Sequence, residues 1–280
     1  MIPFAKMNGS GNDFILIDNR ARPVEAAIGA LDVKDFVRAV CTPKLSVGAD
    51  GLILIQESAR ADFSWRFFNA DGSEVEMCGN GGRCAARFAL LKGIAPTRMT
   101  FETAAGLIDA EVTGPVVKLR LTDPFGLSLD EVLPVEGEDL VVHSVNTGVP
   151  HAVVFAKDLE GCDVFRLGRA LRYHERFRPA GTNANFIRVV DDGTIAVRTY
   201  ERGVEDETLA CGTGSVASAL VAAAKGLVRS PVAVRVKSGE TLRIHFAAGA
   251  GGFEKVYLEG KTALVCEGCL KEEGWLFGRP

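Results

Sequence analysis

Short runs of apolar residues recur along the chain, and turn-forming residues separate them. Several runs alternate apolar and polar positions, as expected for strands with one buried face, and Gly, Asp, Asn or Pro flank them. The pattern predicts strands at Phe14–Ile17, Leu52–Ile55, Phe63–Phe68, Val116–Leu121, Ala152–Phe155, Phe186–Val190, Ile195–Tyr200, Val232–Val236 and Leu242–Phe246. The chain is therefore expected to be rich in short strands.

Two kinds of helix are expected among these strands. The segments Val33–Val40 and Val164–Leu171 predict outer helices. The Ala-rich stretches after Cys78 and Cys211 each end in Lys-Gly, and a cation in the last turn with glycine beyond it is typical of a helix end. Many strands around one central helix in each half predict an α+β fold rather than a βαβ alternation.

The two Ala-rich stretches belong to an internal repeat. At an offset of 133 positions, residues 74–93 match residues 207–226 at eight of twenty positions without a gap. The same offset carries Gly106 onto Gly239. Because the aligned positions spread over most of each half, they predict two domains of the same fold.

The length and the turn signals place the domain boundary. A chain of 280 residues agrees with about two domains. Pro and Gly end an alternating pattern near Asp123-Pro-Phe-Gly126. We expect an N-terminal domain over residues 1–123, onto which the segment 263–280 packs back. The C-terminal domain is expected over residues 124–262.

Composition and charge argue against several classes of protein. The net charge of −4 gives no general attraction to nucleic acid, and no apolar run reaches the ~20 residues of a membrane helix. The first residues lack the apolar segment of a secretion signal. Seven cysteines, an odd number, argue against an extracellular disulfide framework. We therefore expect a cytoplasmic protein with reduced thiols and with neither nucleic acid nor membrane as a partner.

Each half carries an acidic turn, then Cys-Gly-x-Gly, then a helix start, at Cys78 and at Cys211. The N–H groups of a helix start bind anions, and the helix dipole lowers a thiol pKa towards thiolate. A lone Cys-Gly is more often a buried residue beside a tight turn, but two equivalent copies favour function. A pseudo-twofold axis would make the copies face each other. They then predict an acid and a base on opposite sides of one α-carbon, which can invert it.

Eight motifs, in order along nearly the whole chain, resemble the diaminopimelate epimerase family. They are Lys6-Met-Asn-Gly-Ser-Gly-Asn-Asp-Phe14, Gly48-Ala-Asp-Gly51, Phe68-Asn-Ala-Asp-Gly-Ser-Glu74, Met77-Cys-Gly-Asn-Gly-Gly-Arg83, Gly148-Val-Pro-His151, Thr182-Asn-Ala-Asn-Phe186, Tyr200-Glu-Arg-Gly203 and Ala210-Cys-Gly-Thr-Gly214. The resemblance implies an isomerase that interconverts LL- and meso-2,6-diaminopimelate in lysine and peptidoglycan-precursor biosynthesis. It implies no pyridoxal phosphate and no metal. It also implies a homodimer, with two pseudo-symmetric domains in each chain, each a mostly antiparallel sheet wrapped around a central helix.

The resemblance further implies roles for individual residues. Cys78 and Cys211 would be the acid/base pair, and His151 and Glu201 would tune the thiols. Substrate contacts are implied for Asn12, Asn69, Gly79, Asn80, Asn183, Glu201, Arg202, Gly212 and Thr213. Backbone N–H groups at the two helix starts would hold the reacting carboxylate, and the other side chains would hold mainly the distal, uninverted end. Arginine suits that end because it offers a carboxylate a two-pronged donor.

Two alternatives to this function stay open. Gly51 and Val149 stand where some family members carry Gln and Asn near the distal substrate end. The first alternative is therefore a related cofactor-independent racemase that acts on another amino acid. The second is a non-enzymatic thiol switch in which the two repeated cysteines form a disulfide. Cys266-Glu-Gly-Cys269 has no second pair at zinc spacing, so these two residues are interpreted as ordinary buried or surface thiols.

Overall fold

The computed structural model describes residues 1–249 and 252–276, and its chain divides into two compact units. The first unit comprises residues 1–119 and 260–280, and the second comprises residues 120–259. The last four residues of the C-terminal segment, 277–280, lie outside the described part of the chain. The strand β18 of that segment pairs antiparallel with β1 in the first unit.

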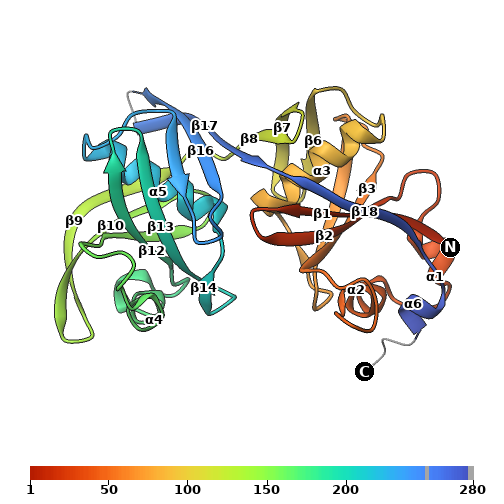
Figure 1. Cartoon of the computed structure of the whole chain (residues 1–280), viewed down its shortest axis with the longest axis horizontal. Helices are drawn as coiled ribbons and strands as arrows, with labels where there is room; N and C mark the ends of the chain where they lie inside the picture. Colours follow the sequence, from red (N-terminus) through yellow and green to blue (C-terminus); the bar gives the residue numbers. More distant parts are fainter. Residues whose placement is uncertain (250–251, 277–280) are drawn as a thin grey trace. The chain divides into compact units, whose positions relative to one another are not determined.

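The first unit is built on one sheet with strand order β18–β1–β2–β3–β4–β6–β7–β8 (Figure 1). Among its described residues, β2–β3 and β4–β6 are parallel pairs and the other neighbours are antiparallel, while β5 adds to β4. The bounds are β1 Ile2–Gly9, β2 Asn12–Asp18, α1 Val24–Ile28, α2 Val33–Cys41, β3 Gly51–Gln56, β4 Phe63–Asn69, β5 Glu74–Val75, α3 Gly79–Leu91, β6 Arg98–Thr103, β7 Gly106–Thr113, β8 Val116–Arg120, β18 Ala263–Leu270 and α6 Glu273–Leu276.

The second unit repeats this plan with the order β9–β10–β11–β12–β13–β15–β16–β17. Its parallel pairs, among the described residues, are β11–β12 and β13–β15, and β14 adds to β13. The bounds are β9 Phe125–Val135, β10 Glu138–Asn146, β11 Pro150–Phe155, α4 Val164–Arg172, the 3₁₀ turn η1 Glu175–Phe177, β12 Asn183–Asp191, β13 Thr194–Glu201, β14 Asp206–Thr208, α5 Gly212–Ala224, β15 Val232–Arg235, β16 Thr241–Gly249 and β17 Gly252–Lys261.

The two units share their order of elements, and the repeat found in the sequence is the reason. The helices α3 and α5 have the same length, 13 residues, and both start and end at the 133-residue offset. Every strand and helix named from the apolar pattern is present, with small shifts at the ends. The predicted α+β class, with a mostly antiparallel sheet and a central helix in each half, is confirmed.

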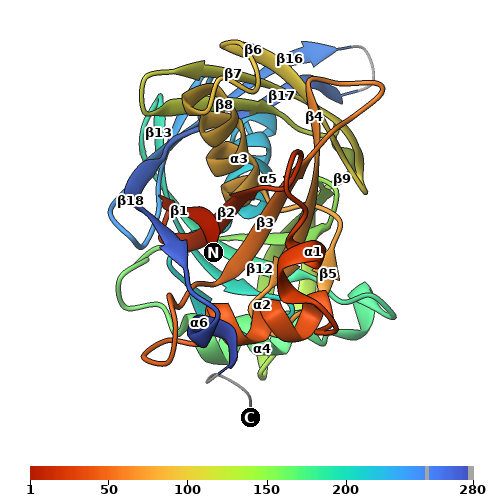
Figure 2. The same ribbon diagram turned by 90° about the vertical axis from the view of Figure 1, so that its right-hand side faces the viewer.

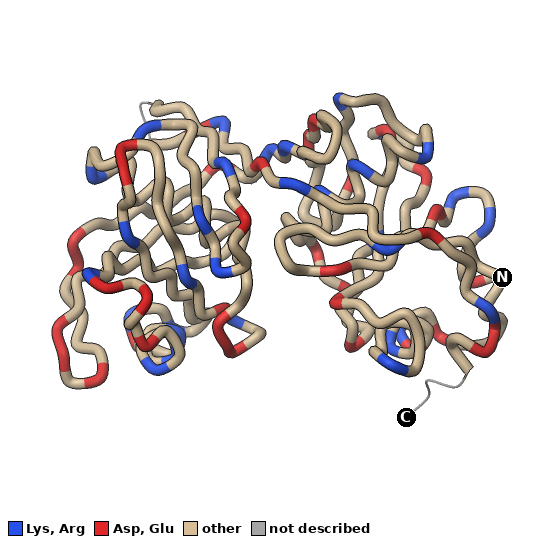
Figure 3. Tube along the Cα trace, viewed as in Figure 1, with Lys and Arg blue, Asp and Glu red and all other residues tan. Residues whose placement is uncertain are grey.

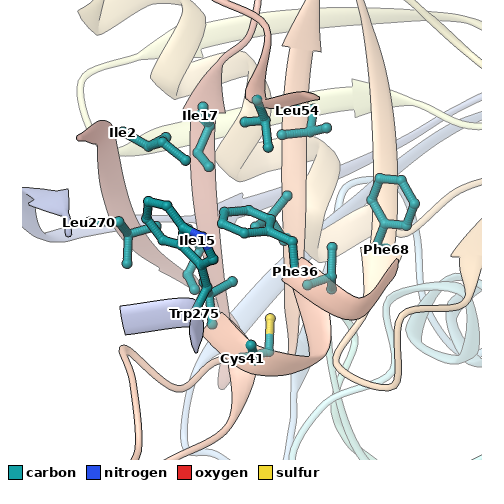
Figure 4. Close-up of a cluster of buried hydrophobic side chains, with 14 of the residues drawn as sticks. Ile2, Ile15, Ile17, Phe36, Cys41, Leu54, Phe68, Leu270 and Trp275 are labelled. Atoms are coloured by element: carbon teal, nitrogen blue, oxygen red, sulfur yellow. The ribbon is translucent and has the colours of Figure 1, made fainter. Parts of the chain in front are cut away.

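In the first unit, helices cover both faces of β2 and β3. The helix α3 packs against β1, β2, β3 and β7, and Figure 2 shows α1, α2 and α6 on the other side of β2 and β3. Ile15 and Ile17 of β2 join the cluster under α2, which Figure 4 draws. In that cluster the Phe36 and Trp275 rings meet edge to face with centroids 5.6 Å apart. Because both faces of β2 and β3 are buried, these two strands are continuous apolar runs.

In the second unit α5 is buried on all sides. Its residues from Gly214 to Ala222 are all buried, and the helix packs against β10, β11, β12, β13, β15 and β16. These residues are small or apolar, which suits a helix enclosed by strands. The outer helix α4 instead covers the far side, where Leu171 and Phe186 lie in a second apolar cluster.

Charged residues of both signs are mixed along the trace of each unit in the view of Figure 3. Arginines in and after α4 are neutralised locally, since Arg172 lies 3.0 Å from Glu205 and Arg176 lies 2.6 Å from Glu131. Within residues 1–249 and 252–276, no helix combines the length and the apolar character that crossing a membrane requires.

Candidate active site

Cys78 caps the start of α3 in the first unit. Its backbone is extended (φ −142°, ψ 120°), and its Sγ accepts a hydrogen bond from the Gly81 N–H at 3.5 Å. The thiol is half-buried. A thiolate at this position would be stabilised by the N–H groups and by the positive end of the helix dipole. The cysteine therefore occupies a position suited to a base.

A chain of side-chain hydrogen bonds lies directly behind this helix start. Arg83 donates to Asn80 Oδ1 at 2.9 Å, and Asn80 Nδ2 donates to Asn12 Oδ1 at 2.7 Å. Asn12 Nδ2 in turn donates to Asp50 Oδ2 at 2.9 Å. We call these four residues the amide chain. It joins the second turn of α3 to the β1–β2 hairpin and to the loop before β3.

Hydrogen bonds and an ion pair hold Asp50, the last residue of the amide chain, in place. The Asp13 N–H donates to Asp50 Oδ2 at 3.1 Å, and the Asp50 N–H donates to Asp13 Oδ1 at 3.0 Å. The Lys6 ammonium lies 2.8 Å from the Asp13 carboxylate and also donates to the Gly48 carbonyl at 2.6 Å. Asn69, which sequence similarity implicates in substrate binding, lies in a turn where its Nδ2 donates to Ser73 Oγ at 3.2 Å.

Cys211 caps the start of α5 in the second unit, and it is buried. Its Sγ lies 3.6 Å from Thr213 Oγ1, and Thr147 Oγ1 donates to the Thr213 carbonyl at 3.2 Å. Burial raises the pKa of Glu201, while hydrogen bonds from Thr208 and Cys211 act in the opposite direction. A carboxyl group that hydrogen-bonds to a thiol and has a raised pKa is a candidate for tuning that thiol.

His151 lies deeper in the second unit and is uncharged. Burial and the positive charge of Arg202 lower the pKa of its imidazole to about 3. Asn185 Nδ2 lies 3.2 Å from His151 Nδ1 and donates to the Ala152 carbonyl at 2.9 Å, while its Oδ1 accepts from Thr199. The amide thus places its N–H on Nδ1, so the imidazole proton resides on Nε2. That buried Nε2 has no hydrogen-bond partner among the described residues.

Asn183 and Arg202 form one local structure. Asn183 Oδ1 accepts from the Arg202 backbone N–H at 2.9 Å, and its Nδ2 donates to the Pro150 carbonyl at 3.1 Å. The Arg202 guanidinium donates to the Ala180 carbonyl at 3.0 Å. Asn183 therefore fixes the backbone that carries Arg202, and the half-buried guanidinium keeps further donors available for a carboxylate.

Comparison with known proteins identifies the family to which the chain belongs. A sequence model described as diaminopimelate epimerase matches residues 4–121 and 143–262. The chain belongs to the diaminopimelate epimerase family. A diaminopimelate epimerase from Aquifex aeolicus is 50% identical over 277 residues, which is 96% of this chain and 98% of the relative. One from Archaeoglobus fulgidus is 42% identical over 286 residues, or 96% of each chain.

Solved structures of more distant proteins share the fold. A Bacillus anthracis phenazine biosynthesis protein of the PhzF family superposes with a TM-score of 0.73 at 16% identity, covering 95% of this chain and 97% of that one. A probable proline racemase from Agrobacterium radiobacter, with bound carbonate, gives 0.70 at 17% identity over 97% and 93%. At these identities the likeness concerns the diaminopimelate epimerase fold alone.

Sequence reasoning singled out some residues of the family motifs and missed their neighbours. Within the first unit, the structure brings Asn12, Gly79 and Asn80 together beside Cys78, and within the second it brings Glu201, Gly212 and Thr213 beside Cys211. The residues that hold Asn12, Asn80, His151 and Glu201 in place were missed: Asp50, Arg83, Asn185, Thr199 and Thr208. Three of them, Asp50, Arg83 and Asn185, lie inside the quoted motifs, and their place in a motif was the signal that could have identified them.

Gly51 lies at a position without room for a side chain. A Cβ on Gly51 would lie 2.6 Å from the Phe68 carbonyl oxygen and 2.7 Å from the Phe67 ring. A side chain at position 51 would therefore require the neighbouring strand β4 to shift. Residues 1–249 and 252–276 contain no cluster of three or more His, Cys, Asp or Glu side chains with the arrangement of a metal site.

Proposed function

We propose that this chain is a diaminopimelate epimerase, an isomerase that interconverts LL- and meso-2,6-diaminopimelate in lysine and peptidoglycan-precursor biosynthesis. The observation that carries the proposal is the pair of cysteine-capped helix starts, Cys78–Gly79 and Cys211–Gly212, in a chain 50% identical to a named epimerase. Cys78 and Cys211 are the acid/base pair. One thiolate removes the α-proton and the other thiol returns a proton to the opposite face of the carbon.

The helix starts also supply the electrostatic part of catalysis. Removing the α-proton moves negative charge onto the substrate carboxylate, and N–H groups near Gly79-Asn80 and Gly212-Thr213 stabilise that charge. Burial raises the pKa of Glu201, which hydrogen-bonds to Cys211, and the neutral His151 offers an Nε2–H. Both groups adjust the proton affinity of the thiols, which exchange the roles of acid and base when the reaction runs in the other direction.

The remaining residues hold the rest of the substrate. The Arg202 guanidinium binds the distal carboxylate, with Asn12, Asn69 and Asn183 as polar partners, and Glu201 also binds an ammonium. Because this distal clamp is polar and asymmetric, it admits one configuration at the centre that is not inverted. A substrate without a second carboxylate and ammonium should therefore bind poorly.

The cysteine assignment is tested with purified Cys78→Ala and Cys211→Ala in heavy water. Wild type should invert LL-diaminopimelate and incorporate deuterium at the α-carbon. Each variant should lose at least about 10²-fold in rate, the size of an acid/base contribution. Cys269→Ala, which removes an exposed thiol on β18, is the control and should keep full activity. Normal inversion by either alanine variant would refute the two-cysteine mechanism.

The substrate is tested separately. Rates with LL-diaminopimelate are compared with those for lysine, glutamate and proline at equal concentration. Faster turnover of one of these would favour a related racemase instead. If no substrate is inverted while oxidation of the thiols changes a binding activity, the thiol-switch alternative would hold.

We also propose that the enzyme is a cytoplasmic homodimer. Membership of the family supports the homodimer, and the odd number of cysteines, seven, supports a reducing compartment such as the cytoplasm. Light scattering on the purified, reduced protein should give twice the chain mass of 29.9 kDa. A mass of one chain across the working concentration range would contradict the dimer.

A further inference from the structure

Arg83 contacts the turn that follows Cys78 from the buried side of α3. Its side chain is fully buried in the second turn of α3. It donates to the Gly79 carbonyl at 3.3 Å, to Asn80 Oδ1 at 2.9 Å and to Ser10 Oγ in the β1–β2 turn. A single guanidinium therefore connects the turn that follows Cys78 with the hairpin that carries Asn12.

The amide chain has a direction, and its two ends set it. A guanidinium can only donate hydrogen bonds, whereas the Asp50 carboxylate can only accept them. The two amides between them pass the hydrogen bonds on from donor to acceptor. Turning Asn80 over would place its NH₂ against the guanidinium. Turning Asn12 over would place its oxygen against the carboxylate. Only the observed orientation satisfies all three hydrogen bonds.

We propose that Arg83 is a positioning residue that determines, through Asn80, which polar atoms Asn12 presents to the substrate; this rests on the proposed function. In the observed orientation each amide keeps one N–H and one oxygen lone pair beyond the chain. A substrate carboxylate needs the N–H, and a substrate ammonium needs the oxygen. If Asn12 turned over, the two would exchange places, and a substrate that carries both groups would be mismatched.

The distinguishing variant is Arg83→Met, which keeps the length and the apolar contacts but donates nothing. The side-chain amides of Asn80 and Asn12 then lose their fixed orientation. KM for LL-diaminopimelate should rise about 10- to 100-fold, which is the size of the loss expected from misplaced substrate contacts. Arg83→Lys restores one donor and should recover part of this loss. The matched control is Arg87→Met, one turn along the same helix, where the lost hydrogen bonds go to Thr262. It should lower thermal stability and leave KM unchanged.

A second readout does not depend on turnover. In wild type the side-chain amide protons of Asn12 and Asn80 should give one sharp set of NMR signals. Arg83→Met should shift or split both, and Arg87→Met should leave them in place. If wild type does not turn over diaminopimelate, the proposed function fails, while these signals still decide the role of Arg83.

Two results would overturn the inference. One is an Arg83→Met protein that folds with a wild-type KM and unchanged amide signals. If that variant does not fold, Asp50→Asn tests the other end of the chain, because it removes the group that only accepts. It should raise KM and split the Asn12 signal. An Asp50→Asn protein with wild-type KM and one set of signals would refute the directed chain.

Discussion

The substitution Gly214→Ala tests how tightly the second cysteine turn is built. Gly214 lies in the first turn of α5, and a Cβ there would fall on Asn185 Oδ1, closer than such atoms approach in proteins. It would also lie 3.2 Å from Cys211 Sγ. Asn185 is fully buried, so its amide must turn or withdraw. We expect loss of stability and of activity together.

The magnitude follows from the hydrogen bonds that Asn185 makes. It donates to the Ala152 carbonyl at 2.9 Å, lies 3.2 Å from His151 Nδ1 and accepts from Thr199 at 2.9 Å. Losing all three costs about 3 kcal/mol at about 1 kcal/mol each. Alanine regains about 0.5–1 kcal/mol over glycine inside a helix. The net loss of about 2 kcal/mol corresponds to a fall in Tm of roughly 4–8 °C for a domain of this size.

The repeat provides the control, because Gly81 is the equivalent position in the first unit. A Cβ there would lie 3.3 Å from the end of the Ile53 side chain and 3.6 Å from Cys78 Cβ, and Ile53 can give way. Gly81→Ala should therefore stay within about 1 kcal/mol of wild type. Thermal unfolding of both variants and of wild type provides the comparison. Equal shifts in Tm for the two substitutions, or an unchanged Tm for Gly214→Ala, would refute this reasoning.

Two further predictions concern pH. The folded pKa of His151, about 3, lies below its ordinary value of 6.5, so its contribution to stability is present above pH 6.5 and is lost as the pH falls towards 3. Wild type should lose about 1.4 kcal/mol per pH unit in that range, and His151→Gln should flatten the dependence of Tm on pH; parallel curves would contradict it. Glu201 has the opposite sign: its raised pKa adds stability below its ordinary value of 4.5, and that stability disappears as the pH rises through the folded value. Glu201→Gln should therefore gain Tm relative to wild type as the pH rises above 4.5, and a difference that does not vary with pH would rule this out.

The elements that the sequence predicted are those with local signals. The Lys-Gly ends of α3 and α5 mark helix ends because Lys92 and Lys225 are the C-caps and the following glycines adopt positive φ. The strands β1 and β18 were missed, since the pairing of Ile2 with Leu270 joins the two ends of the chain and leaves no local pattern. Most of β9 is exposed or half-buried, so it shows no clean alternation of apolar residues.

The residues of the candidate site, too, could be predicted only where the sequence carries a local signal. The repeat alone located Cys78 and Cys211, because the spacing and the glycines of a helix start are local features. The orientation of Asn12 could not be predicted, because it depends on Asp50, 38 residues away, and on Asn80, 68 residues away. The sequence around an asparagine does not determine the orientation of its side-chain amide, and so does not determine where its N–H donors and its oxygen acceptor point. That information exists only once the chain is folded.

The repeated helix starts differ in what holds them, and the difference has a chemical meaning. Behind Cys78 lies a directed chain of amides that starts at a buried arginine and ends at the Asp50 carboxylate. Beside Cys211 lie Glu201, whose pKa is raised, and in the same unit the neutral His151. A fixed arrangement suits recognition, because each donor and acceptor must keep its place. A carboxyl group that hydrogen-bonds to a thiol suits proton transfer, because it can exchange a proton with that thiol. The repeat thus supplies two similar thiols, and the different side chains around Asn80 and Thr213 give each helix start its own surroundings.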